Sequence, residues 1–122
     1  MRLLVIDDSR LDRKMIKRLI NQEEIDASII EADGIDAALG MVASGHFDCI
    51  LIDYHIPGSN GVSLASRIMT CLKEAPPIVM LTAEPSPELA EQALSSGLAD
   101  FMSKQGLTSK QLHRSLSNAL IN

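Results

Sequence analysis

Short hydrophobic runs alternate along the chain with longer segments in which hydrophobic residues recur every three or four positions. The runs occupy residues 3–6, 28–30, 49–52, 78–81 and, more weakly, 100–102. Continuous hydrophobicity, as opposed to alternation with polar residues, is typical of strands that are buried on both faces, as in a parallel sheet. The pattern therefore predicts five strands, each followed by a helix.

The segments between the runs predict amphipathic helices. Their hydrophobic positions are Leu11, Met15, Ile16, Leu19 and Ile20; Ala37, Ala38, Met41 and Val42; Leu64, Ala65, Ile68, Met69 and Leu72; Leu89, Ala90, Ala93 and Leu94; and Leu112, Leu116, Ala119 and Leu120. The fourth helix has clear boundaries, because Ser86 can cap its start, Pro87 suits its first turn and Gly97 can end it. The repeated β-α order predicts a doubly wound α/β fold with right-handed crossovers and helices on both faces of the sheet.

Composition narrows the range of functions. The chain has 122 residues, a length that suits one domain over residues 1–122, and a net charge of −5. This charge, with only two Phe, one Tyr and no Trp, argues against nucleic-acid binding. No hydrophobic run is long enough for a signal peptide or a membrane span. Cys49 and Cys71 lack metal-ligand spacing and are predicted to be buried thiols in a reducing compartment, which favours the cytoplasm.

Polar residues with chemical potential follow the predicted strands. In doubly wound sheets, functional residues gather at the carboxyl ends of the strands. Asp7 and Asp8 follow the first strand, and Asp53 follows the third. Three neighbouring carboxylates repel one another, and a hard divalent cation such as Mg²⁺ would offset that repulsion. Thr82 follows the fourth strand, and Lys104 lies just after the fifth.

A cation and a hydroxyl around a carboxylate form a site for an anion that arrives on that carboxylate. Phosphoryl transfer to Asp53 fits this description, because its catalysis is mostly positioning and charge neutralisation. Each residue alone has a simpler interpretation: Asp8 or Ser9 as a helix cap, Lys104 as a surface charge, Thr82 as an ordinary strand end. Their combination at matching strand ends favours the site.

The whole set resembles the receiver domain of two-component response regulators. The motifs that carry the resemblance are Asp7-Asp8, Asp53-Tyr-His-Ile-Pro57-Gly-Ser-Asn-Gly61, Thr82-Ala83 and Phe101-Met-Ser-Lys104. The resemblance covers essentially the whole chain. It implies a flavodoxin-like (βα)5 fold with strand order 2-1-3-4-5, and a phosphorylation-activated signalling switch that is not an enzyme in its own right.

The resemblance also implies roles for the acidic residues. Asp53 would be the phosphoacceptor. Asp8 would bind the metal directly, and Asp7 would do so through water. Asp53 and the backbone carbonyl of His55 would complete the ligands of Mg²⁺, for which Mn²⁺ is an alternative.

The remaining motif residues would bind the phosphoryl group and change the protein surface in response to it. Lys104 would pair with Asp53 before phosphorylation and with the phosphoryl group afterwards. Thr82 would hydrogen-bond a phosphoryl oxygen, and Ala83 would leave room for the group. Phe101 would then move inward and change the face formed by the fourth helix, fifth strand and fifth helix. The alternative for Phe101 is an ordinary strand side chain packed on the last helix.

Two further features of the resemblance concern tuning and geometry. His55 and Glu84 occupy the variable positions that flank the phosphosite, and they would tune the lifetime of the phosphoryl group. Gln105 follows Lys104 where most receivers have a proline, usually after a cis bond. A cis bond before a residue other than proline costs about 2.5–4 kcal/mol, so a trans bond, or else a retained strained turn, is expected here.

The expected partners are a histidine kinase or phosphotransfer protein and a downstream effector domain or protein. The domain itself is expected to be cytoplasmic, a monomer or weak dimer, without nucleic-acid or membrane contacts. One alternative is a metal-dependent phosphohydrolase with Asp53 as nucleophile, which His55 disfavours because a second acid is usual there. The other is a phosphorylation-independent interaction module, which Gln105 keeps open. Nucleotide binding is disfavoured, because no glycine-rich phosphate loop is present.

Overall fold

The structure, a computed structural model, describes residues 1–121. Its elements are β1 (Arg2–Ile6), α1 (Arg10–Gln22), β2 (Ser28–Ala32), α2 (Ile35–Ser44), β3 (Cys49–Asp53), β4 (His55–Ile56), β5 (Ser59–Asn60), α3 (Gly61–Cys71), β6 (Ile78–Thr82), α4 (Pro87–Ser95), β7 (Asp100–Ser103) and α5 (Ser109–Ile121). Five strands form a parallel sheet in the order β2-β1-β3-β6-β7. This confirms the predicted doubly wound fold and its strand order.

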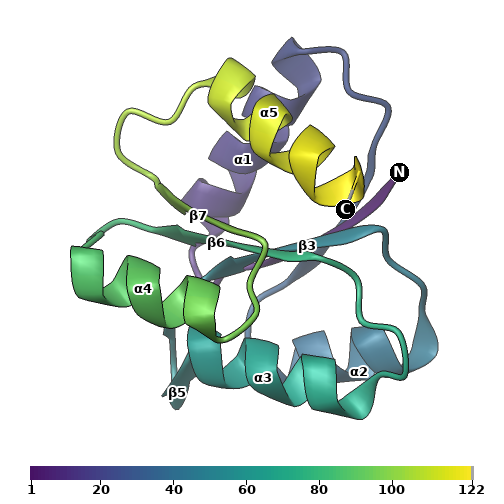
Figure 1. Cartoon of the computed structure of the whole chain (residues 1–122). Helices are drawn as coiled ribbons and strands as arrows, with labels where there is room; N and C mark the ends of the chain where they lie inside the picture. The colour runs from purple at the N-terminus through teal and green to yellow at the C-terminus, as the bar shows by residue number, and fades with distance from the viewer. Residues whose placement is uncertain (122) are drawn as a thin grey trace.

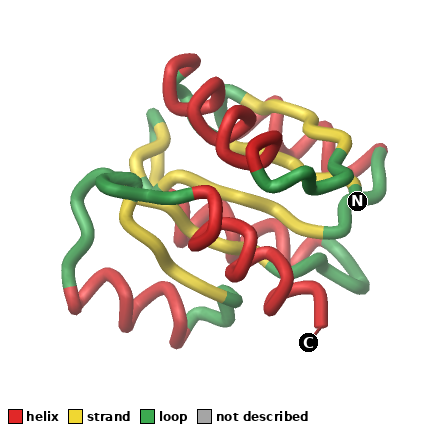
Figure 2. The backbone as a smooth tube through the Cα atoms, turned by 90° about the horizontal axis from the view of Figure 1, so that it is seen from above, coloured by secondary structure: helices red, strands yellow, loops and turns green. Residues whose placement is uncertain are grey.

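Helices cover both faces of the sheet, with α1 and α5 on one face and α2, α3 and α4 on the other (Figures 1 and 2). Side chains alternate between the faces, so Leu3 and Val5 pack toward α1 and α5, whereas Leu4 and Ile6 pack toward the other three helices. Strands β3 and β6 are buried along their whole length, as their continuous hydrophobicity predicts. Within residues 1–121, no helix is long and apolar enough to span a bilayer.

The predicted helix boundaries are confirmed at two sites. Ser86 caps α4, its side chain accepting a hydrogen bond from the Leu89 N–H at 3.1 Å. Gly97 follows that helix with a φ of 97°, a conformation that glycine adopts without strain. Of the two candidate caps for the first helix, Ser9 is the one that accepts from the helix, at 3.2 Å from the Asp12 N–H.

In three helices, one residue that was predicted to lie on the buried hydrophobic face is exposed. Leu11, Leu94 and Leu120 are 77%, 51% and 46% exposed. Each lies in the first or last turn of its helix, and periodicity alone does not show how far along a helix the sheet extends. The prediction for Cys71 is also wrong: this thiol is exposed at the end of α3, whereas Cys49 is buried as predicted.

A small hairpin, β4–β5, interrupts the segment after β3 and was not predicted. His55 pairs with Asn60, and Ile56 pairs with Ser59. Asn60 then caps α3 by accepting from the Ser63 N–H at 2.9 Å. At Gly61 the backbone passes so close to the Asp53 carbonyl oxygen that a β-carbon would collide with it. The hairpin and Gly61 together hold the chain tightly around the end of β3.

Candidate functional site

The three acids singled out in the sequence lie together at the carboxyl edge of the sheet. Asp7 directly follows β1 and Asp53 ends β3, and these strands are neighbours in which Ile6 pairs with Ile52. Carboxylate oxygens of Asp7, Asp8 and Asp53 lie within 4.8 Å of one another. Asp7 and Asp53 are buried, and Asp8 is exposed. The topology therefore concentrates negative charge at one point.

The two buried carboxylates are paired unequally. Asp7 Oδ1 accepts from the Ser9 N–H at 2.9 Å, and Asp7 Oδ2 accepts from Lys104 Nζ at 2.7 Å. Asp53 Oδ2 lies 3.3 Å from Lys104 Nζ. Asp53 Oδ1 is buried without a hydrogen-bond partner among the described residues. Because an unsatisfied buried acceptor is unfavourable, this oxygen is the one best placed to gain a new partner.

Burial and charge act in opposite directions on these groups. Burial raises the pKa of Asp53, and the negative charge of Asp7 adds to this, while Lys104 and the His55 backbone N–H offset part of it. Burial alone would lower the pKa of Lys104, but its hydrogen bonds to Asp12 and Asp7 raise it overall. Lys104 is therefore a permanent cation beside an acid whose charge is poorly compensated.

Lys104 reaches the acids from the end of β7, and its side chain is 7% exposed. Its backbone N–H donates to the Thr82 carbonyl at 2.8 Å, which joins this turn to the end of β6. Its Nζ also lies 2.7 Å from Asp12 Oδ2 in the first turn of α1. Sequence reasoning missed Asp12, although a signal was present: it lies four residues before the buried Ile16, on the buried face of α1. The predicted stripe had placed Leu11 on that face.

Thr82 ends β6 and is fully buried. Its Oγ1 accepts from the Glu84 N–H at 3.2 Å, so the hydroxyl braces the turn that follows. Ala83 and Glu84 are exposed. His55 and Glu84 line a cavity of about 340 Å³ between the segment after β3 and the start of α4. The two predicted tuning residues therefore share one groove.

Phe101 lies in β7 and is partly buried against the cluster that the sheet shares with α2, α3 and α4. The alternative that Phe101 packs on the last helix is wrong, because strand alternation places Met102 on that side. After Lys104, the Gln105 N–H donates to Ser103 Oγ at 3.1 Å. No cis peptide bond occurs among residues 1–121, as expected for a bond that precedes glutamine.

The donor set suits a hard cation. Three carboxylates converge, and the unpartnered Asp53 Oδ1 would gain a partner from a bound ion. Oxygen ligands of this kind are those that Mg²⁺ and Mn²⁺ prefer. The residues present therefore fit a divalent metal site.

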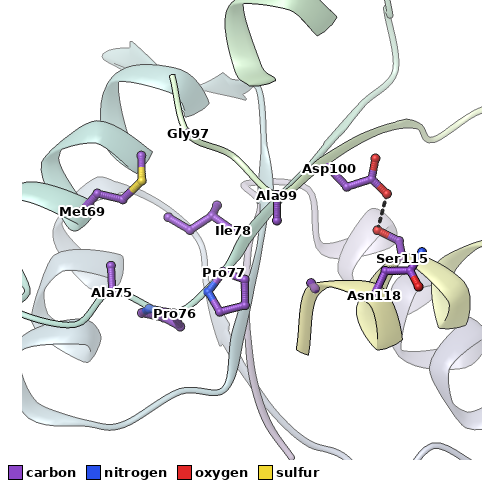
Figure 3. Close-up of a pocket in the computed structure, with 11 residues that line it drawn as sticks. Met69, Ala75, Pro76, Pro77, Ile78, Gly97, Ala99, Asp100, Ser115 and Asn118 are labelled. Carbon is purple, nitrogen blue, oxygen red and sulfur yellow. Dashed lines mark hydrogen bonds between the residues drawn. The ribbon is translucent and has the colours of Figure 1, made fainter. Parts of the chain in front are cut away.

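A larger cavity, of about 540 Å³, lies away from this site (Figure 3). It is lined by Ile78 and Asp100, which begin β6 and β7, whereas the acids and Lys104 lie at the carboxyl ends of the strands. Asp100 Oδ2 accepts from Ser115 Oγ at 2.6 Å, so its carboxylate serves to join β7 to α5. The larger cavity therefore does not coincide with the cluster of acids and Lys104.

Comparison with known proteins agrees with the site geometry. The family model described as "Response regulator receiver domain" matches residues 3–117. Chemotaxis protein CheY of Pseudomonas aeruginosa is 33% identical over 106 residues, which are 85% of this chain and 84% of that protein. A protein-glutamate methylesterase/protein-glutamine glutaminase of Anaeromyxobacter dehalogenans is 38% identical over 109 residues. That match covers 88% of this chain but only 31% of the relative, and the match to sensory/regulatory protein RpfC of Xanthomonas campestris covers 16% of its relative.

Solved structures give the same result. The chemotaxis response regulator CheY4 of Vibrio cholerae has a TM-score of 0.82 and 25% identity, with 98% of each chain covered. A receiver domain protein from Clostridium thermocellum shares the fold with a TM-score of 0.86 at 20% identity, over 98% of this chain and 94% of the other. Fold, motif residues and sequence match therefore agree, and the chain belongs to the response regulator receiver domains of two-component systems.

Proposed function

We propose that this receiver is a phosphorylation-activated switch whose phosphoacceptor is Asp53. The observation that carries the proposal is the unequal pairing of the two buried acids. Asp7 has a short hydrogen bond at each oxygen, whereas one buried oxygen of Asp53 has no partner among residues 1–121. Asp53 is thus the carboxylate that can gain a group while disturbing fewer existing hydrogen bonds. Membership of the receiver family supports the same assignment.

The proposed reaction is a direct phosphoryl transfer. An Asp53 oxygen attacks the phosphorus of the donor, and a new O–P bond forms as the bond to the leaving group breaks. The leaving group departs with that electron pair, as a histidine side chain from a kinase or phosphotransfer protein, or as acetate from acetyl phosphate. The Lys104 ammonium lies beside Asp53 and would neutralise charge on the phosphoryl oxygens.

A divalent ion is part of the proposal. Asp7, Asp8, Asp53 and the backbone carbonyl of His55 would hold Mg²⁺, or Mn²⁺ in its place. The bound ion would supply positive charge to the transferring group. Its affinity would come from the crowding of the carboxylates, which adds to the effect of burial in raising the pKa of Asp53.

The switch would act through Thr82 and Phe101. A phosphoryl group carries a charge of about −1.5 to −2 and three strong acceptors, and it shifts a population only through contacts that differ between two states. Thr82 can keep accepting from the Glu84 N–H while its O–H donates to a phosphoryl oxygen. Phe101 is only partly buried and would move inward as that turn changes, altering the surface of α4, β7 and α5 for an effector.

One experiment tests the phosphoacceptor. The protein is incubated with Mg²⁺ and acetyl phosphate, and its intact mass is compared with those of Asp53→Asn and the control Asp33→Asn. Asp33 also follows a strand at this edge of the sheet but lies outside the proposed site. We expect one base-labile phosphoryl group on the wild type and control and none on Asp53→Asn. Turnover of phosphate esters without an adduct would indicate a phosphohydrolase, and neither adduct nor Mg²⁺ binding would indicate an interaction module.

A further inference from the structure

Asp12 is not among the predicted site residues, but it lies as close to Lys104 as any of the predicted acids does. Asp12 Oδ2 and Asp7 Oδ2 each lie 2.7 Å from Lys104 Nζ, whereas Asp53 Oδ2 lies at 3.3 Å. The Asp12 side chain is 38% exposed, against 2% for Asp7 and 7% for Lys104. The buried ammonium is therefore held mainly on the α1 side, by one buried acid and one that reaches solvent.

Ser9 fixes the relative position of these two acids. Its N–H donates to Asp7 Oδ1 at 2.9 Å, and its Oγ accepts from the Asp12 N–H at 3.2 Å. The start of α1 is thereby joined to the end of β1 through one residue. Asp12 consequently faces Lys104 because of the helix cap, and the contact does not depend on a long flexible side chain.

The donors of Lys104 are limited. An ammonium has three N–H groups, and two of them make the short hydrogen bonds to Asp7 and Asp12. A phosphoryl group on Asp53 would bring three acceptor oxygens that compete for these donors. Asp12 is the partner that can yield, because its carboxylate can turn to water, whereas Asp7 is buried.

We propose that Asp12 is a positioning residue that restrains Lys104 while Asp53 is unmodified and releases it when a phosphoryl group arrives. The proposal rests on the function proposed above for Asp53. The negative charge of Asp12 and its contact with Lys104 both oppose phosphorylation, because a carboxylate near the site also repels a phosphoryl dianion. Asp12 therefore favours the unphosphorylated state in two ways, and its removal shifts the balance toward the phosphorylated state.

The first test measures that balance. Steady-state phosphorylation by acetyl phosphate and Mg²⁺ is compared in the wild type, Asp12→Asn, Asp12→Glu and Asp36→Asn. Asp36 is the matched control, because it is also a first-turn acid, on α2, without a role in the site. For Asp12→Asn we expect the ratio of phosphorylated to free protein to rise roughly twofold to fivefold, the scale of one partly exposed charge pair. Asp12→Glu restores the charge and returns toward the wild type, and Asp36→Asn behaves as the wild type.

The second test needs no phosphorylation. The Lys104 ammonium signal is followed by NMR in metal-free, ¹⁵N-lysine-labelled protein and assigned by its loss in Lys104→Met. A buried ammonium with two short hydrogen bonds exchanges slowly with water, so the signal should shift and broaden in Asp12→Asn and persist in Asp12→Glu and Asp36→Asn.

The two tests separate the two proposals. An unchanged Lys104 signal in Asp12→Asn, or a phosphorylation ratio equal to that of Asp36→Asn or below the wild type, overturns the role of Asp12 alone. No adduct on the wild type overturns the function of Asp53 and with it the release step. In that case the NMR signal still decides whether Asp12 restrains the ammonium.

Discussion

Asp7 and Asp53 are both buried acids, but their carboxylates are unequally hydrogen-bonded. Asp7 Oδ2 accepts a short hydrogen bond from Lys104, and its other oxygen accepts one from Ser9. Asp53 has one oxygen without a hydrogen-bond partner in the described part of the chain, and burial together with the charge of Asp7 raises its pKa. Asp7 thus stabilises the fold, whereas ionised Asp53 opposes it. Residues that are destabilising in this way are typical of functional sites.

This contrast predicts opposite effects of two similar substitutions in metal-free protein at pH 7. Asp53→Asn should raise the free energy of unfolding by about 0.5–2 kcal/mol, because it removes a poorly compensated charge and leaves Lys104 bonded to Asp7 and Asp12. Asp7→Asn should lower it by about 1–3 kcal/mol, because it weakens a buried charged pair. Urea denaturation with a chelator present measures both. A loss of stability in Asp53→Asn comparable to that in Asp7→Asn would contradict the assignment.

The effect of Asp53 on the free energy of unfolding also has a defined pH dependence. Its pKa is raised in the folded state, so proton binding by Asp53 favours folding. That contribution is fully present below the unfolded pKa of about 3.9 and is lost as the pH rises through the folded value. The stability advantage of Asp53→Asn over the wild type should therefore grow as the pH rises from acid to neutral. An advantage that shrinks over this range would contradict the raised pKa.

At the scale of elements, the segment between β3 and α3 determines how Asp53 is presented. The Gly61 N–H donates to the Tyr54 carbonyl at 2.7 Å, which closes the hairpin loop against the end of β3. A β-carbon on Gly61 would collide with the Asp53 carbonyl oxygen and lie 2.9 Å from Met80 Cε. The position of Asp53 therefore depends on a residue without a side chain.

We expect Gly61→Ala to lower the free energy of unfolding by about 1–3 kcal/mol, the usual range for overpacking a filled site. It should also reduce phosphorylation by acetyl phosphate, because the loop must move away from Asp53. Gly40→Ala is the matched control, since Gly40 lies inside α2 with open space around it. That change should raise stability by about 0.5–1 kcal/mol. Thermal denaturation compares the two, and equal effects would show that packing at Gly61 is not tight.

The same segment shows what sequence patterns do and do not reveal. Strands β3 and β6 could be predicted because burial on both faces leaves a continuous hydrophobic run. The two-residue strands β4 and β5 are too short to have a period. The acids at the strand ends could be predicted because topology alone brings them together. Asp12 was missed although its spacing from Ile16 was a signal, because a stripe drawn through Leu11 gives the wrong rotation of α1, and the contact with Lys104 depends on that rotation.

At the scale of the molecule, the acids, the lysine and a buried hydroxyl gather at one edge of the sheet. The ends of β1, β3, β6 and β7 contribute the acids, the hydroxyl and the lysine, while the opposite edge holds the larger cavity, lined by Met69, Pro77 and Gly97 (Figure 3). The carboxylates belong to strands in the centre of the sheet, and the whole core must be folded to bring them within reach of one another. A cation that binds them is therefore linked to global stability.

Mg²⁺ should accordingly stabilise the whole protein by mass action, by about 2.7 kcal/mol at a concentration one hundred times its dissociation constant. Asp8→Asn should lose most of this gain while changing metal-free stability little, because Asp8 is exposed. Binding can be followed directly by the fluorescence of Tyr54, which adjoins Asp53 and is the single tyrosine in a chain without tryptophan. Asp33→Asn, an exposed acid at the end of β2, should keep the full Mg²⁺ response. If Mg²⁺ stabilised Asp8→Asn and Asp33→Asn equally, the ion would be bound elsewhere. Only a cation held at the ends of the central strands would need Asp8 as a ligand.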